Sequence, residues 1–292
     1  MVFLDENTSR FFDPDHSREY ANEKTVPRDE PISRERHPMQ IKQIIDLSIP
    51  LENANYTGFQ PSIQYFDHAE GARKLGKALG LAQDDFPDGM ALAWEEYRGI
   101  THMATHLDAP WHFGPTSEGR PSKTIDQVPL DWCLRDGVRL DMRAFGKGYS
   151  ITANDVKDAL HKIDYTIKPF DIVLLWTESD KLMHDPRYGE ANPGMSAEAT
   201  FWLIDQGVKI IGTDGYGYDM GFAEMARKYK EGDKGALWPG HFAGRKREYC
   251  HIEAMGNMEN IPMDYGFTVS VLPVKLAKAS AAWARCVAII WA

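Results

Sequence analysis

The stretch THMATHLDAPWHF, residues 101–113, decides how the remainder of this chain is interpreted. Its even-numbered positions carry four titratable side chains: His102, His106, Asp108 and His112. In an extended chain, residues of one parity project from the same side of a strand, while the intervening apolar residues face a core. Pro110 cannot donate to a strand ladder, so we expect the strand to lie at an edge or to end there.

Four such side chains on one face would be costly to bury without a partner. A divalent cation removes that cost, because neutral imidazole and carboxylate groups are its natural ligands. The alternative is a polar, solvated strand face, which a lone histidine would favour. Three histidines and an aspartate so close together favour a metal site.

The chain has 292 residues and a formal net charge of −10, with 43% hydrophobic and 26% charged residues. These values are typical of a protein that buries a core, and they exclude disorder as a description of the whole chain. The negative charge and the lack of a concentrated Lys/Arg run argue against nucleic-acid binding. No apolar stretch approaches the roughly 18 residues needed to cross a bilayer, and the acidic N-terminus does not resemble a signal peptide. We therefore expect a cytoplasmic protein without membrane attachment.

Three cysteines are widely spaced and form no CxxC pair: Cys133, Cys250 and Cys286. An odd number without metal-type spacing predicts reduced thiols that fill the core. Cys250 beside His251 suggests a thiol nucleophile, but sequence neighbours in a strand point to opposite faces, so we discount that hypothesis.

Residues 1–40 carry charges of alternating sign with little apolar periodicity, so this segment cannot bury enough surface to order itself. It is interpreted as a charged N-terminal extension, either a loose tail or an arm that orders against a neighbouring subunit. The sequence does not distinguish the two. Residues 41–292 are interpreted as one domain.

Apolar periodicity within 41–292 predicts both strands and helices. Strands are expected at 44–49, 91–97, 100–113, 138–142, 171–176, 208–213, 267–272 and 286–291. Helices are expected at 67–79, from 152 onward and at 196–206. Asp67 is a plausible N-cap, and Thr152 with Asp155 is close to a capping box. This order predicts a single α/β domain with a mixed β-sheet and packed helices.

The stretch at 101–113 resembles the HxGTHxDxPxH signature of the cyclase-like metal hydrolases, the family of bacterial kynurenine formamidase (arylformamidase) and isatin hydrolase. Weaker similarities follow in the family's order, at 46–51, 124–130, 173–177, 211–214 and 252–262. The resemblance covers the chain from about residue 41 onward. It implies a fold of the swivelling β/β/α type and a homodimer or homotetramer.

The resemblance also implies a metal site. Its ligands would be His102, His106 and Asp108 from the signature, completed by a distal pair at His241 and Glu253. These would hold one or two Zn²⁺ or Mn²⁺ ions, and the aspartate can bridge two ions. His251, two residues before Glu253, is a rival ligand.

The last signature histidine, His112, is implied as the general acid/base. An imidazole beside a cationic centre can take a proton from an attacking water and pass it to a leaving amine.

Two departures from the family pattern bear on the pocket. Ala104 stands where the family has glycine, so a positive φ there would be strained. The region 215–247 is longer than in simple formamidases, and its apolar side chains can form a lid, a subunit contact or ordinary core: Tyr216, Tyr218, Met220, Phe222, Trp238 and Phe242.

The favoured function is a metal-dependent hydrolase that opens an amide, imide or lactone carbonyl of an aromatic or cyclic small molecule. N-formylkynurenine is the default substrate by resemblance, followed by isatin-like lactams and dienelactones. A stacking wall for such a ring is expected among five aromatic residues: Phe59, Tyr65, Phe66, Trp111 and Phe113.

Two other functions are compatible with parts of this pattern. A non-haem Fe(II), 2-oxoacid-dependent oxygenase would use His106, Asp108 and His241 as a two-His-one-carboxylate triad, with Arg245 or Arg247 for the 2-oxoacid. It leaves the other two signature histidines without a role. The third hypothesis is a non-catalytic ligand-binding protein that retains the metal.

Overall fold

The computed structural model describes residues 40–53 and 61–292. The predicted N-terminal extension therefore lies outside the described residues except for Gln40. Phe59 of the expected stacking wall also lies outside them.

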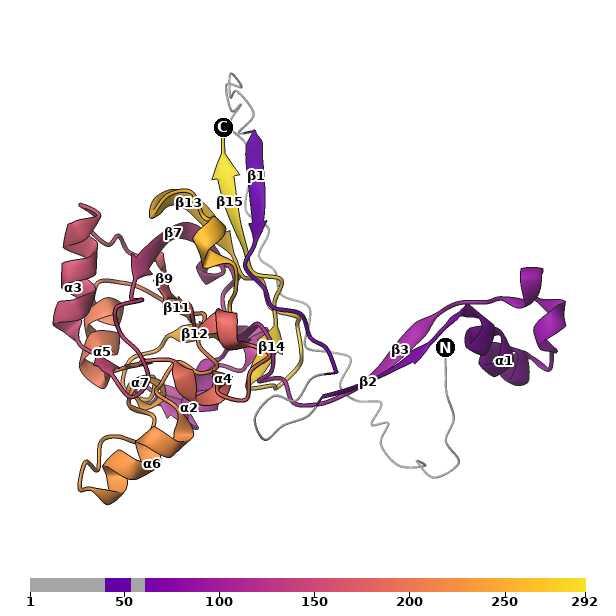
Figure 1. The fold of residues 1–292 in the computed structure, drawn as a ribbon, viewed down its shortest axis with the longest axis horizontal. Coiled ribbons are helices and arrows are strands. Elements are labelled where there is room, and N and C mark those ends of the chain that lie inside the picture. Colours follow the sequence, from indigo (N-terminus) through magenta and orange to yellow (C-terminus); the bar gives the residue numbers. More distant parts are fainter. Residues whose placement is uncertain (1–39, 54–60) are drawn as a thin grey trace. The chain divides into compact units, whose positions relative to one another are not determined.

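A nine-stranded mixed sheet forms the centre of the domain and curls like half a barrel (Figure 1). Its strands lie side by side in this order: β1 (Ile41–Asp46), β15 (Val287–Trp291), β13 (Tyr265–Ser270), β7 (Leu134–Asp141), β9 (Ile172–Trp176), β11 (Ile210–Thr213), β12 (Cys250–Glu253), β4 (His106–Asp108) and β14 (Ala281–Trp283). The four strands from β7 to β12 run parallel, and the strands on either side pair antiparallel.

Helices and short strands connect this sheet. The α-helices are α1 (His68–Leu79), α2 (Pro110–Phe113), α3 (Ala153–Lys162), α4 (Tyr188–Ala191), α5 (Ala197–Asp205), α6 (Phe222–Lys230) and α7 (Pro239–Ala243). The 3₁₀ turns are η2 (Gln83–Asp85), η3 (Pro87–Gly89), η4 (Ile125–Gln127), η5 (Leu130–Trp132), η6 (Ser179–Leu182) and η7 (Met258–Asn260). Three short pairs of strands complete the described elements: β2 (Ser62–Phe66) with β3 (Trp94–Arg98), β5 (Thr116–Ser117) with β6 (Arg120–Pro121), and β8 (Ser150–Ile151) with β10 (Gly194–Met195).

The centre of the sheet is buried on both faces. Every residue of β9 is buried, and alternate side chains enter two different cores. Ile172 and Leu174 belong to the core shared with β12, β13 and β15. Val173 and Leu175 belong to the core that α3 and α5 cover. Each fully buried aliphatic side chain of this kind contributes roughly 1.5–3 kcal/mol, so a continuous apolar strand is stable here although it shows no alternation in sequence.

Local capping signals explain where the helices begin. The Asp67 carboxylate accepts from the Glu70 N–H, and α1 starts at the next residue. Thr152 and Asp155 form a reciprocal capping box at the start of α3. These predictions are confirmed, as is the mixed sheet with packed helices.

The strand expected at 100–113 is wrong as a single element. Only His106–Asp108 is a strand. It lies between β12 and β14 and not at an edge, but it ends just before Pro110, which is the other outcome expected from that proline. Ala104 has φ 50°, which breaks the extended chain before β4. Pro110 occupies the first turn of α2, where its missing N–H costs nothing. The parity argument therefore applies to His106 and Asp108 alone.

Candidate metal centre

Two neighbouring antiparallel strands carry the core of the site. In the register of β4 and β12, His106 lies opposite Glu253, and Asp108 lies opposite His251. Residues two apart share one face of a strand, so all four side chains project to the same side of the sheet. Leu107 projects to the other side, into the hydrophobic core.

His102 and His112 reach the same place from outside the strand. His102 comes from the bend before β4, and its Nδ1 lies 2.8 Å from Asp108 Oδ1. His112 comes from α2, and its Nε2 lies 3.5 Å from Asp108 Oδ2. The structure thus brings the four signature residues together, although by a bend and a helical turn rather than by one strand.

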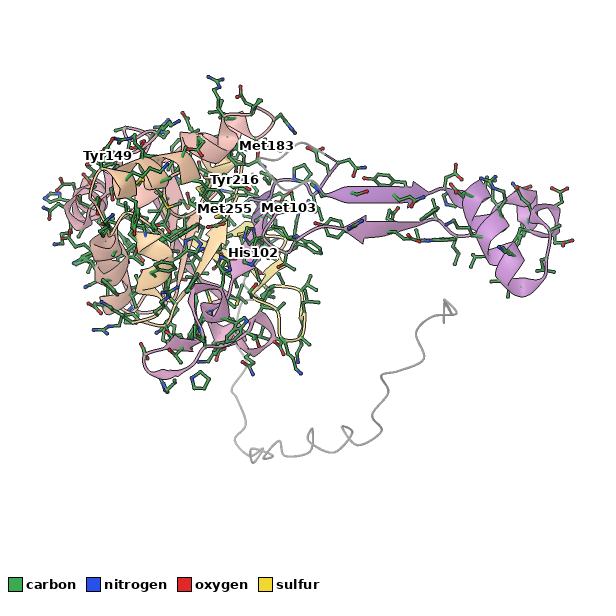
Figure 2. All side chains as sticks on the ribbon, turned by 90° about the horizontal axis from the view of Figure 1, so that it is seen from below. His102, Met103, Tyr149, Met183, Tyr216 and Met255 are labelled. Atoms are coloured by element: carbon green, nitrogen blue, oxygen red, sulfur yellow. The ribbon has the colours of Figure 1, made fainter. Side chains whose placement is uncertain are left out.

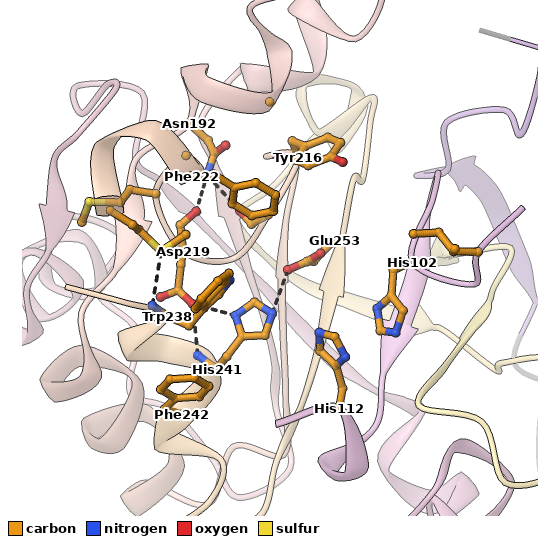
Figure 3. Close-up of a pocket in the computed structure, with 16 residues that line it drawn as sticks. His102, His112, Asn192, Tyr216, Asp219, Phe222, Trp238, His241, Phe242 and Glu253 are labelled. Atoms are coloured by element: carbon orange, nitrogen blue, oxygen red, sulfur yellow. Dashed lines mark hydrogen bonds and ion pairs between the residues drawn. The ribbon is translucent and has the colours of Figure 1, made fainter. Parts of the chain in front are cut away.

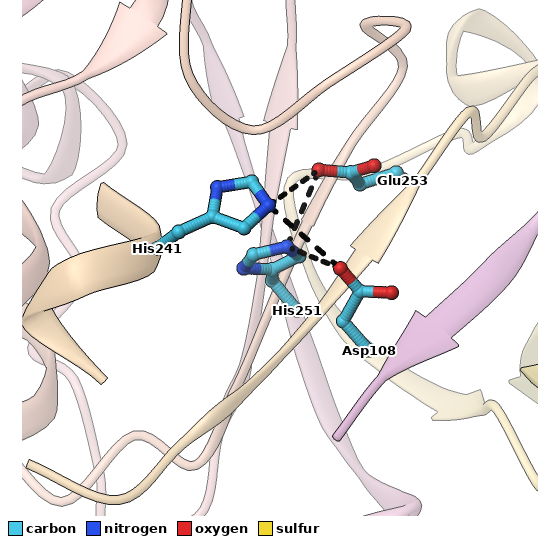
Figure 4. Close-up of side chains that lie close together, drawn as sticks. All are labelled: Asp108, His241, His251 and Glu253. Atoms are coloured by element: carbon cyan, nitrogen blue, oxygen red, sulfur yellow. Dashed lines mark hydrogen bonds and ion pairs between the residues drawn. The ribbon is translucent and has the colours of Figure 1, made fainter. Parts of the chain in front are cut away.

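The distal pair, His241 and Glu253, lies beside the signature residues. His241 lies on α7, and its Nε2 is 3.6 Å from Glu253 Oε1 and 3.8 Å from Asp108 Oδ2 (Figure 4). Asp219 holds the start of α7 by accepting from the Gly240 and His241 N–H groups. Glu253, which sequence alone would make a surface acid, is 7% exposed.

The rival residue, His251, does not replace His241 but lies beside it. Its Nε2 is 3.0 Å from Asp108 Oδ2 and 3.2 Å from Glu253 Oε1. It is fully buried, whereas His241 also borders the open cavity.

Three histidines of this cluster of imidazoles and carboxylates have one ring nitrogen that points away from the carboxylates. Each of these nitrogens lies close to a hydrogen-bond acceptor outside the cluster. His106 Nδ1 lies 2.8 Å from the Ala104 carbonyl, and His241 Nδ1 lies 2.6 Å from the Asp219 carboxylate. His251 Nδ1 lies 3.2 Å from the Tyr249 hydroxyl. Such acceptors keep the proton on Nδ1 and leave the Nε2 lone pair directed into the cluster, which is the arrangement of metal-bound histidines.

His102 uses the opposite ring nitrogen. Its Nε2 lies 2.9 Å from the Ser280 hydroxyl, and Nδ1 faces the cluster. His112 differs from the other four, because no hydrogen bond joins its ring to any other described residue, and its side chain is about one-third exposed.

The donor set fits a divalent cation. His106 Nε2 and Asp108 Oδ1 are buried without a hydrogen-bond partner among the described residues, and they lie 3.2 Å apart. Ligand atoms around a tetrahedral Zn²⁺ lie about 3.3 Å from one another, since each is about 2.0–2.1 Å from the ion. Two groups of side chains are compact enough to share an ion: His102, His106 and Asp108, and Asp108, His241, His251 and Glu253.

Without an ion, the site holds two buried carboxylates whose negative charge depends on the neighbouring histidines. Burial opposes ionisation of Asp108, but the surrounding histidines outweigh it and hold the pKa of Asp108 well below its usual range. Burial likewise opposes ionisation of Glu253. Without an ion, contact with the two carboxylates outweighs burial and raises the pKa of His251 to about 9, and the hydrogen bond from this protonated ring lowers the pKa of Glu253 to about 2. Burial lowers the pKa of His112 to about 4, so His112 is neutral at pH 7. Two buried carboxylates therefore need positive charge, and the histidine nearest the solvent is an available base.

A cavity of about 420 Å³ opens above the cluster (Figure 3). Its floor holds His102, His112, His241 and Glu253. Its walls are mainly apolar and come largely from the 215–247 region: Tyr216, Met220, Phe222, Met225, Trp238 and Phe242. His102 and Tyr216 lie in the same part of the domain although more than a hundred residues separate them (Figure 2). The hypothesis that this region forms a lid over the site agrees with this placement, and of its aromatics only Tyr218 is ordinary core.

The expected stacking wall is wrong for the described residues. Tyr65 is 60% exposed on β2, and Phe66 packs against Trp94. Trp111 is exposed, and Phe113 lies beneath the site against His241 and His251. None of the four lines the cavity. Tyr65 and Phe66 lie on β2, and Trp111 and Phe113 lie on α2, where the chain has left the extended conformation after β4.

Two other possibilities, a 2-oxoacid site at Arg245 or Arg247 and the already discounted thiol nucleophile at Cys250, find no support at the cavity. The Arg245 guanidinium donates to the Phe113 carbonyl and stacks on Phe242, and Arg247 pairs with Asp205. Neither arginine lines the cavity, which argues against a 2-oxoacid site there. Cys250 packs in the core on the face opposite His251, and burial raises the pKa of its thiol. All three cysteines are free and buried, as expected.

Sequence reasoning missed the residues that orient the ligands. Asp219, Tyr249 and Ser280 belong to no motif. Asp219 and Ser280 are far from their histidines along the chain, whereas Tyr249 lies two residues before His251. The only signal for Asp219 was its position inside the unusually long 215–247 region.

The fold is shared with solved structures described as hydrolases. An isatin hydrolase A from Labrenzia aggregata bound to benzyl benzoate is 17% identical, with a TM-score of 0.63 over 85% of this chain and 93% of that chain. An isatin hydrolase bound to the product analogue thioisatinate is 18% identical, with a TM-score of 0.65 over 86% and 93%. A metal-dependent hydrolase from Bacillus stearothermophilus, described as predicted, is 18% identical, with a TM-score of 0.53 over 85% and 98%.

The family itself is identified from the sequence. The model of the putative cyclase family matches residues 45–220, which is more than half of the chain. The chain therefore belongs to the putative cyclase family, and its resemblance to the cyclase-like metal hydrolases is confirmed. No curated protein matches the chain in a sequence search. Within the described residues, no helix is long and apolar enough to cross a membrane.

Proposed function

We propose that this protein is a metal-dependent hydrolase that opens the amide or lactone carbonyl of a neutral aromatic or cyclic small molecule. The supporting observation is the cluster of imidazole and carboxylate groups at the floor of an apolar cavity (Figure 3). An isatin hydrolase with the same fold was solved with a bound product analogue, which is consistent with this proposal.

His102, His106, Asp108, His241 and Glu253 would hold one or two Zn²⁺ or Mn²⁺ ions. A bound ion of this kind lowers the pKa of its water toward about 7 and polarises a carbonyl oxygen. The inward ring nitrogens and the two buried carboxylates supply donors that these ions accept.

His112 would move the proton. Hydrolysis adds water across the acyl bond, so the nucleophile loses a proton and the leaving nitrogen or oxygen gains one. His112 is neutral because burial lowers its pKa, its ring is partly open to the cavity, and it belongs to neither ligand group. A neutral imidazole in this position can accept the first proton and then donate it to the leaving group.

The cavity lining favours an uncharged substrate. Among the described residues that line it, none is a lysine or arginine. An α-amino acid such as N-formylkynurenine carries a carboxylate, which would find no cationic partner there. A lactam or lactone fused to an aromatic ring presents one polar carbonyl to the floor and an apolar ring to Trp238, Phe222 and Phe242.

The test is a hydrolysis screen with metal-free and metal-loaded protein. Chelated protein should be inactive on every substrate, and Zn²⁺ or Mn²⁺ should restore ring opening of isatin-like lactams or aromatic lactones. N-formylkynurenine should be hydrolysed less efficiently than the neutral rings. Absence of hydrolysis across lactam, lactone and formanilide substrates in fully loaded protein would favour a non-catalytic binding protein instead.

A further inference from the structure

The cluster contains one buried ligand-type residue, His251, to which neither the signature nor the distal pair gives a role. We propose that His251 is a metal ligand in its own right, which completes a second, closed four-ligand site with His241, Asp108 and Glu253 (Figure 4). The proposal rests on the function proposed above, because it requires the cluster to bind metal.

The two carboxylates divide the cluster into two halves. Asp108 Oδ1 faces His102 and His106, and Asp108 Oδ2 faces His241 and His251. Glu253 is divided in the same way, since its Oε2 lies 3.5 Å from His106 Nε2 while its Oε1 faces His241 and His251. Each carboxylate thus offers one oxygen to each half, as a bridging ligand does.

The half formed with His251 has the spacing of a tetrahedral site. Its histidine–carboxylate distances run from 3.0 to 3.8 Å, around the value of about 3.3 Å expected for ligands of one Zn²⁺. Two imidazole nitrogens and two carboxylate oxygens fill four coordination positions. A site closed by four protein ligands retains its ion, whereas a catalytic site keeps one position open.

The hydroxyl of Tyr249 sets the tautomer of His251. That hydroxyl carries a single proton, which it donates to the Gly240 carbonyl at 2.8 Å. Toward His251 Nδ1, 3.2 Å away, it can therefore only accept. The proton of the neutral ring is held on Nδ1, so the Nε2 lone pair points at Asp108 and Glu253.

The alternative to a cation is a proton on His251 Nε2, but that proton would leave one nitrogen of this half without a partner. His241 also presents an inward lone pair, because the Asp219 carboxylate holds its Nδ1 proton. A proton shared by His251 with the two carboxylates would leave His241 Nε2 facing two acceptor oxygens at 3.6 and 3.8 Å. One cation among the four atoms neutralises the carboxylates and satisfies both imidazoles.

Metal stoichiometry tests the proposal directly. Wild-type protein, stripped by chelation and titrated with Zn²⁺, should bind two ions per chain by calorimetry and elemental analysis. His251→Phe keeps a ring against Tyr218 and Phe113 but cannot ligate, so it should bind one ion. His251→Gln provides a second variant if His251→Phe does not fold, as judged by circular dichroism.

Tyr249 and Tyr218 both contact the His251 ring, so their phenylalanine variants serve as a test and its control. Tyr249→Phe removes the acceptor on Nδ1 and should weaken binding of the second ion by about 10–100-fold, the usual effect of losing such a partner. Tyr218→Phe is the control, because Tyr218 stacks on the His251 ring at 4.6 Å while its hydroxyl contacts Thr200. It should leave both affinities unchanged.

Cobalt titration follows the two ions by an independent optical signal. The visible absorption of tetrahedral Co²⁺ should rise through two equivalents, and the second increment should be missing in His251→Phe. One ion per chain in wild-type protein, unchanged by His251→Phe, would overturn the inference while leaving the proposed hydrolase intact. No ion bound at all would instead contradict the proposed function.

Discussion

At the scale of single residues, the five histidines of the site are chemically distinct. Four have one ring nitrogen held by a neighbouring polar group and the other directed at the carboxylates. His112 alone lacks such a holding partner among the described residues and borders the cavity. The resemblance implies a proton carrier at this position, and the open ring of His112 is consistent with that proposed role.

Replacing His112→Ala should lower kcat by roughly 10²–10⁴-fold, the usual loss when general acid–base catalysis is removed. Bound metal should stay at the wild-type level, because His112 belongs to neither ligand group. Steady-state kinetics with elemental analysis checks both outcomes. His161→Ala, an exposed histidine on α3, is the control. An unchanged kcat would remove His112 from the mechanism.

Ala104 carries the backbone strain that its sequence position predicted. Its φ of 50° is a left-handed conformation that costs an L-residue roughly 1–2 kcal/mol, and glycine adopts it freely. Ala104→Gly should therefore raise the free energy of unfolding by up to about 1 kcal/mol, since the greater entropy of an unfolded glycine offsets part of the gain. Urea denaturation measures the change. Ala159→Gly, inside α3, should instead destabilise the protein, and equal effects of the two would disprove the strain.

At the scale of elements, short helical turns add side chains to the site that β4 and β12 form. The turn α7 is only five residues long. It holds the proposed ligand His241 in place because Asp219 accepts from its first N–H groups and contacts the His241 ring. Asp219→Ala should weaken metal affinity by about 10–100-fold. Titration against a chelator of known affinity measures this loss. Asp205→Ala, an exposed carboxylate on α5, should leave affinity unchanged, and an equal effect of both would point to net charge instead.

The ends of β9 and β11 are joined by a buried acid. The Asp214 carboxylate accepts from the N–H groups of Thr177 and Glu178, and burial raises its pKa to about 7. The folded protein then keeps a proton that the unfolded chain loses above about pH 4. This contribution to stability is complete below pH 4 and is lost as the pH rises to about 7.

Asp214→Asn should remove that pH dependence, because an amide is neutral throughout. The difference in unfolding free energy between the variant and the wild type should shift in favour of the variant from pH 4.5 to pH 7.5. Urea denaturation at both values measures it. A difference that is constant with pH would show that Asp214 is ionised in the folded state throughout this range.

At the scale of the whole molecule, the segment of β2, α1 and β3 exposes a set of apolar side chains: Tyr65, Leu79, Leu81, Met90 and Leu92. The expectation of a homodimer or homotetramer stays a prediction, and an apolar surface of this kind favours association. Light scattering should give a mass of two or four chains. Leu92→Glu should reduce it, whereas Leu130→Glu, at an equally exposed leucine in η5, should not. A monomeric wild-type protein would contradict the prediction.

Much of the fold could be predicted where the signals are local. Asp67, Thr152 and the apolar run of β9 each act through neighbours in the chain, so their elements are found where expected. The stretch before β4 misled, because even-numbered spacing cannot reveal that Ala104 leaves the extended region. The cavity wall was misassigned for the same reason, since side chains nearest in sequence to the signature turn away from it.

The sequence by itself determined the chemistry of the centre: the family, the donor types and the two segments that supply them. Imidazoles and carboxylates bring that preference with them wherever the chain places them. Only the tertiary structure decided that His241 and His251 both enter the cluster and which nitrogen each presents. Those outcomes depend on Asp219 and the register of β4 with β12, which join segments far apart in sequence, and on the local contact between Tyr249 and His251. None of these contacts leaves a periodicity in the chain.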